Sequence, residues 1–114
     1  MRFPDFEAAI GRLQIAISEG LDNALLHVLD HIVSLLERKY RQLGNLHDLE
    51  TAIARSEAAV GATPVGHPDR AARLNTLGCL LSTRYDRLGN LQDLVAAIAR
   101  TFAALEATPE DHPE

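Results

Sequence analysis

Hydrophobic residues recur at steps of three and four along the chain, which is the spacing of one face of an α-helix. The prolines lie between such stretches or in a first turn, where a helix tolerates them. The pattern predicts five helices, at about 4–19, 22–43, 46–60, 69–88 and 91–107. We therefore expect an all-α chain without strands.

The helical pattern repeats with a period of 45 residues. Residues 40–55 read YRQLGNLHDLETAIAR, and residues 85–100 read YDRLGNLQDLVAAIAR. A partial third copy stands at 5–12, which parallels 48–55. We name the helices at 22–43 and 69–88 type A, and the other three type B. The interpretation is one domain, 1–114, made of a half repeat (4–20), two repeats (21–64 and 65–109) and a tail (110–114).

The links from A to B helices are short, so neighbouring helices are expected to lie antiparallel. Gly44 and Gly89 can take the left-handed conformation that ends a helix. Asp48 and Asp93 are predicted to accept hydrogen bonds from free amides at the start of the next helix. Arg55 and Arg100 are predicted to form ion pairs with these two carboxylates.

The first A helix is apolar around more than half of its circumference, so we expect it to be packed on two sides. Its polar residues fall in one arc, which predicts a single exposed stripe: His27, Asp30, His31, Ser34, Glu37, Arg38 and Arg41. The B helices carry regularly spaced alanines that allow a neighbouring helix to approach closely: Ala52, Ala59, Ala97 and Ala104.

Composition narrows the class of protein. Hydrophobic residues make up 46% and aromatic residues only 4%, so the core must be aliphatic. The single cysteine, Cys79, excludes an internal disulfide and fits a reducing compartment. A net charge of −5 argues against nucleic acid as a partner, and no apolar run is long enough for a membrane span. We expect a cytoplasmic protein.

The second A helix carries Leu74, Leu77, Gly78 and Leu81, and the B helix after it carries Ala97 and Ala104 and is followed by Pro109. This pattern resembles the tetratricopeptide repeat. The long unit is similar to repeats of kinesin light chains, and more closely to those of fungal and actinobacterial proteins that carry caspase-like or nucleotide-binding signalling domains. The resemblance implies antiparallel helix pairs stacked as a short right-handed α-solenoid of five helices. Leu74 and Leu81 are large, as the pattern requires, but they replace its usual Trp and Tyr. Thr101 and Ser56 replace a large aromatic residue of the B helix, and Val33 replaces the Gly of the first A helix. These departures leave HEAT-like or other α-solenoid repeats as an alternative.

The resemblance also implies a binding surface, because A helices line the concave groove of tetratricopeptide proteins. Asn75 matches an Asn that hydrogen-bonds peptide backbone in relatives. The residues expected to contact a protein or peptide partner are His27, Asp30, Ser34, Glu37, Asn75, Cys79 and Ser82.

Catalytic and metal-binding motifs are sparse. His27, Asp30 and His31 share a helix face, and two imidazoles at i and i+4 can present themselves to one ion. This supports an alternative hypothesis of a metal- or small-ligand-binding helical protein, even an enzyme, with the site at an oligomer interface. His67 precedes Pro68 and is expected to stabilise a turn. We predict neither catalysis nor a cofactor.

The two ends of the predicted stack lack a polar cap, and such ends expose apolar surface. The apolar residues are Ile10, Leu13 and Ile17 at the front, and Leu94, Ile98, Phe102 and Leu105 at the back. We therefore expect self-association, most simply a homodimer, by stacking or by exchange of helices. The sequence as a whole predicts a non-catalytic module for protein interaction or self-assembly.

Overall fold

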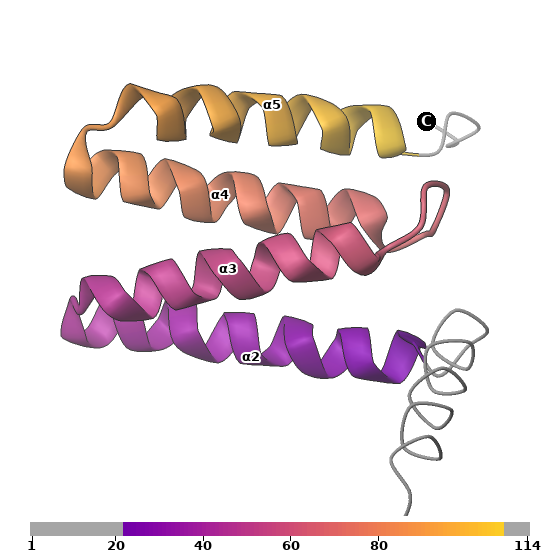
Figure 1. The fold of residues 1–114 in the computed structure, drawn as a ribbon, viewed down its shortest axis with the longest axis horizontal. Helices are drawn as coiled ribbons and strands as arrows, with labels where there is room; N and C mark the ends of the chain where they lie inside the picture. Colours follow the sequence, from indigo (N-terminus) through magenta and orange to yellow (C-terminus); the bar gives the residue numbers. More distant parts are fainter. Residues whose placement is uncertain (1–21, 109–114) are drawn as a thin grey trace, which may run out of the picture.

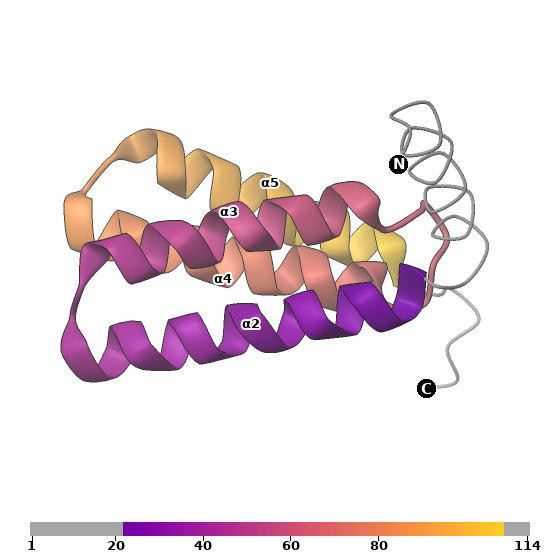
Figure 2. The same cartoon turned by 60° about the horizontal axis from the view of Figure 1, so that its bottom comes forward.

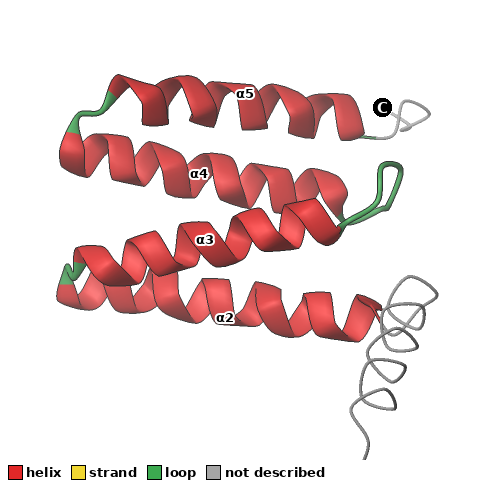
Figure 3. Ribbon diagram, viewed as in Figure 1, coloured by secondary structure: helices red, strands yellow, loops and turns green. Residues whose placement is uncertain are grey.

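A computed structural model describes residues 22–108 of the chain, and this part contains four α-helices and no strand (Figure 3). They are α2 (Asp22–Leu43), α3 (Leu46–Ala62), α4 (Arg70–Leu88) and α5 (Leu91–Ala107). Consecutive helices run in opposite directions and follow one another across the molecule (Figure 1). These bounds confirm the all-α prediction to within two residues. The helix predicted at 4–19, and with it the five-helix count, lies outside the described residues.

Both A-to-B links lie at the same end of the molecule, and the longer loop between α3 and α4 lies at the other end (Figure 2). Gly44 and Gly89 have φ values of 71° and 72°, in the left-handed region where glycine avoids a steric penalty. Their N–H groups donate to the carbonyls of Tyr40 and Tyr85, both at 2.7 Å. The predicted role of both glycines is confirmed.

The predicted capping role of Asp48 and Asp93 is wrong. Asn45 Oδ1 instead accepts the hydrogen bond from the His47 N–H, at 3.2 Å. The two aspartates stand at the third position of their helices and turn toward the preceding A helix. Arg84 donates to both oxygens of Asp93, at 3.0 and 2.8 Å, whereas Lys39 Nζ lies 3.7 Å from Asp48 Oδ1.

The predicted ion pairs of Arg55 and Arg100 with Asp48 and Asp93 are therefore also wrong. Arg55 follows Asp48 by seven residues, which is about two helical turns along the same helix. The facing A helix brings Lys39 and Arg84 closer to the two carboxylates. Arg55 and Arg100 are exposed.

The core lies along the middle of the stack, between α3 and its two neighbours and between α4 and α5. Leu49, Leu74, Leu77 and Leu80 are fully buried. The predicted close approach of the B helices is confirmed, because four alanines are buried there: Ala52, Ala59, Ala97 and Ala104.

Helix α2 is packed on one side only within the described part of the chain. Leu26 and Val33 are buried. An opposite apolar face is 37% to 56% exposed and consists of Leu25, Val28, Ile32 and Leu35. The prediction that this helix is packed on two sides does not hold in residues 22–108, because no described helix lies against that face.

None of the helices in residues 22–108 combines the length and the apolar character that a membrane span requires.

Candidate functional site

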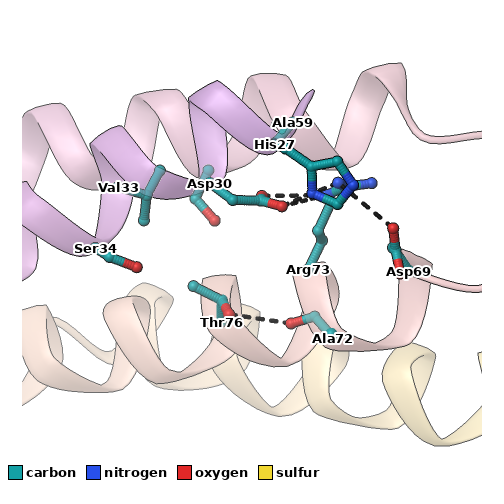
Figure 4. A pocket seen from close by; sticks show the side chains of 10 residues that line it. His27, Asp30, Val33, Ser34, Ala59, Asp69, Ala72, Arg73 and Thr76 are labelled. Carbon is teal, nitrogen blue, oxygen red and sulfur yellow. Dashed lines mark hydrogen bonds and ion pairs between the residues drawn. The ribbon is translucent and has the colours of Figure 1, made fainter. Parts of the chain in front are cut away.

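A groove of about 250 Å³ lies between the two A helices, α2 and α4, with α3 behind it. Figure 4 shows side chains from both A helices turned toward it. The lining residues are His27, Asp30, Val33 and Ser34 from α2, Ser56 and Ala59 from α3, and Asp69, Ala72, Arg73 and Thr76 at the start of α4.

An ion pair between Arg73 and Asp30 forms one end of the groove (Figure 4). The Arg73 Nε donates to both Asp30 oxygens at 3.1 Å, and Nη2 donates to Oδ2 at 2.9 Å. A further bond runs from Nη1 to Thr63 Oγ1, at 3.2 Å. Because the Arg73 side chain is only 4% exposed and such forked contacts fix both partners, this cluster holds α2, the end of α3 and α4 together.

The rest of the groove offers polar groups to a ligand. His27 and Ser34 are exposed and make no hydrogen bond within the described residues. Thr76 uses its hydroxyl to donate to the Ala72 carbonyl, at 3.0 Å. Ala72 is exposed and contributes only a methyl group, so space remains above it. The groove therefore combines a rigid charged end with a small apolar patch and two free hydrogen-bonding side chains.

The predicted partner-binding residues divide into two sets. His27, Asp30 and Ser34 line this groove. Glu37 lies further along α2, where its carboxylate accepts a hydrogen bond from Arg41 at 2.8 Å.

The three predicted residues on α4 do not line the groove. Asn75 lies at a shallow depression beside α5, and Cys79 and Ser82 line a separate groove between α4 and α5. The predicted residues therefore occupy one side of each A helix without forming one continuous pocket.

Arg73 and Thr76 also line the groove, and neither was predicted from the sequence as a binding residue. Arg73 stands 45 residues after Val28, so an arginine occupies a position that is apolar in the preceding repeat. This break in the apolar pattern was the signal that could have identified it. Asp30 was expected in an exposed stripe, but it is half-buried because Arg73 binds its carboxylate.

The alternative metal hypothesis rested on His27, Asp30 and His31. Both histidines are exposed, but Arg73 engages both carboxylate oxygens of Asp30. Within residues 22–108, no group of three His, Cys, Asp or Glu side chains is placed to hold a metal ion.

The remaining candidates are structural. His67 Nδ1 accepts a hydrogen bond from the Asp69 N–H at 3.0 Å, which confirms its predicted role in the turn before α4. The hydrogen bonds to Asp93 raise the pKa of Arg84 above its ordinary value, so this guanidinium remains charged.

The residues predicted for self-association lie at the two ends of the chain. Three of them, Ile10, Leu13 and Ile17, lie outside the described residues. Ile98 and Phe102 are exposed on α5, and Leu94 is half-buried.

Comparison of the chain with protein-family models, with curated proteins and with solved structures finds no match.

Proposed function

We propose that this chain is a non-catalytic, tetratricopeptide-like interaction module that acts in the cytoplasm and binds a segment of a partner protein in the groove between its A helices. The observation that carries the proposal is the groove itself. It is open, it lies between the two A helices, and it is lined by His27 and Ser34, whose hydrogen-bonding groups are free within the described residues.

The groove suits a short extended segment. A strand-like peptide offers backbone N–H and C=O groups on both sides, and side chains such as His27 and Ser34 can bond to them. The uncovered methyl of Ala72 leaves room for one small or flat side chain of the partner. The groove has a volume of about 250 Å³, which limits the contact to a few residues of the partner. We therefore expect modest affinity for a single segment.

Carboxylates at the rim define the preferred charge of the partner. Asp30 and Asp69 are 41% and 43% exposed, and Arg73 is the one cation among the residues that line the groove. The surplus negative charge favours neutral or basic segments over acidic ones.

A displayed library of random peptides tests this proposal. Peptides selected on the full chain should lose binding to an Ala72→Arg variant, because the long side chain fills the groove. Ala58→Arg is the matched control, since Ala58 is equally an exposed helical alanine but lies on α3 and does not line the groove. Selected peptides that bind Ala72→Arg as tightly as the unchanged chain would contradict the proposal.

A further inference from the structure

Helix α5 carries an exposed apolar face, which we call the α5 outer face. Its residues are Leu91, Val95, Ile98, Phe102 and Leu105, and each is 49% to 66% exposed. They follow one another at steps of four, three, four and three, a mean period of 3.5 residues. That is the spacing of a seam between two helices packed along their length.

The preceding repeat provides an internal comparison. Counting back 45 residues, Val95 and Phe102 correspond to Glu50 and Glu57 of α3. Both glutamates are exposed, even though α3 is covered by α2 and α4. Stacking of one more A helix on α5, in the way α4 stacks on α3, would therefore leave Val95 and Phe102 uncovered.

The α5 outer face is thus broader than the repeat architecture requires. Ile98 and Leu105 correspond to Ile53 and Val60, which are only 3% and 8% exposed in α3. Val95 and Phe102 extend this strip onto a side of the helix that faces solvent in the earlier repeat. A partner that covers the whole strip must lie directly over α5.

We propose that the occupant is α5 of a second copy, packed antiparallel in a two-fold symmetric dimer. A seam of period 3.5 is self-complementary, because each helix supplies the same alternating apolar residues. The five residues of the face carry no charge, so a second copy brings no like charges into the contact.

Charge placement selects the antiparallel direction. Glu106 borders the α5 outer face and follows Ile98 by eight residues, or about 12 Å along the helix. In an antiparallel pair centred near Ile98, the two Glu106 carboxylates are about 24 Å apart along the axis. In a parallel pair they would lie side by side and repel each other.

The surface beside α5 enlarges the contact. A groove of about 360 Å³ lies between α4 and α5, and its walls include Leu94, Ile98, Phe102 and Leu105. Side chains of the second copy can enter this groove while the two helices pack. The dimer contact is distinct from the groove between α2 and α4, so each proposal can fail without the other.

Light scattering coupled to size-exclusion chromatography tests the dimer across a concentration series of the full chain. We expect the unchanged chain to reach twice its monomer mass of 12.4 kDa. The double variant Val95→Glu with Phe102→Glu should stay monomeric with unchanged helical circular dichroism, because α3 carries glutamate at both corresponding positions. Arg100→Glu changes the net charge by the same amount on the opposite side of the helix, and it should remain dimeric.

Cysteine cross-linking tests the direction of packing in a Cys79→Ser background. Ile98→Cys, near the centre of the seam, should form a disulfide-linked dimer, whereas Leu105→Cys, near its end, should not. Because the cross-linking does not use the double glutamate variant, it still tests the dimer if that variant fails to fold. A monomeric unchanged chain at every concentration, a dimer that survives both glutamates, or equal cross-linking at the two positions would overturn the proposal.

Discussion

At the scale of single residues, the two repeats form the same ion pair with different cations. Lys39 and Asp48 in the first repeat correspond to Arg84 and Asp93 in the second. Arg84 forms two hydrogen bonds, but Lys39 approaches only one oxygen, at 3.7 Å. The other oxygen, Asp48 Oδ2, is buried and has no hydrogen-bond partner, which costs stability.

Lys39→Arg should therefore stabilise the protein. The forked guanidinium can reach both oxygens of Asp48, as Arg84 does for Asp93. Because the Lys39 side chain is 57% exposed, solvent screening limits the expected gain in the free energy of unfolding to about 1 kcal/mol. Urea denaturation measures the gain, and Arg84→Lys should lose a similar amount. An unchanged or lower midpoint for Lys39→Arg would count against this account.

Substitution by alanine at two glycines inside helices should change the stability of the fold in opposite directions. A Cβ on Gly78 would lie 3.0 Å from Thr101 Oγ1 and 3.3 Å from the Ala97 carbonyl oxygen, so α4 and α5 would have to separate. We expect Gly78→Ala to destabilise the fold by about 1–2 kcal/mol, as overpacking does. Gly61 has nothing within 4 Å of its Cβ position, and Gly61→Ala should stabilise α3 by about 0.5–1 kcal/mol.

Thermal unfolding of the two variants checks this pair. A melting temperature that rises for Gly78→Ala as well as for Gly61→Ala would contradict the close contact of α4 and α5 at Gly78.

At the scale of elements, the Arg73–Asp30 pair determines how the two helical hairpins fit together. Removing one partner leaves a buried charge, which is more damaging than removing both. Asp30→Asn should cost about 2 kcal/mol, a value reduced because Asp30 is 41% exposed. Asp30→Asn combined with Arg73→Met should recover most of that loss. Chemical denaturation of Asp30→Asn, Arg73→Met and the double variant measures the coupling between the two residues. Strictly additive losses of stability would contradict this coupling.

The elements themselves were predictable from the sequence. Helix bounds follow from apolar spacing, and the ends at Gly44 and Gly89 follow from a conformation that glycine adopts without strain. Both are local properties of the chain. The buried alanines Ala52 and Ala97 were also predictable, because regular spacing of small residues already marks a close helix contact.

The contacts between elements were not predictable in the same way. Arg73 and Asp30 are 43 residues apart, and their pairing depends on how α4 stacks against α2. The carboxylates of Asp48 and Asp93 had two partners within plausible reach, the amides of their own helix and a cation on the facing helix. The rotation of each B helix against its A helix decides between them, and the sequence pattern leaves that rotation undetermined. The groove follows from the same stacking, so Arg73 and Thr76 on its α4 side were not identified in advance.

At the scale of the whole molecule, the four described helices form one stack with different surfaces. The inner helices α3 and α4 each lie between two neighbours (Figure 1). Helices α2 and α5 each have a neighbour on one side and expose apolar residues. The groove between the A helices is separate from the exposed apolar face of α2 and from the α5 outer face. One copy can thus associate through α5 and still present its groove to a partner.

If the groove between α2 and α4 binds a partner segment, an NMR titration should locate the bound segment there. Isotope-labelled protein is titrated with a peptide selected from the displayed library, and chemical shifts are followed residue by residue. We expect saturable chemical-shift perturbations concentrated at four groove residues: His27, Ser34, Ala72 and Thr76. Perturbations confined to the α5 outer face or spread over the B helices, with the groove residues unmoved, would contradict it.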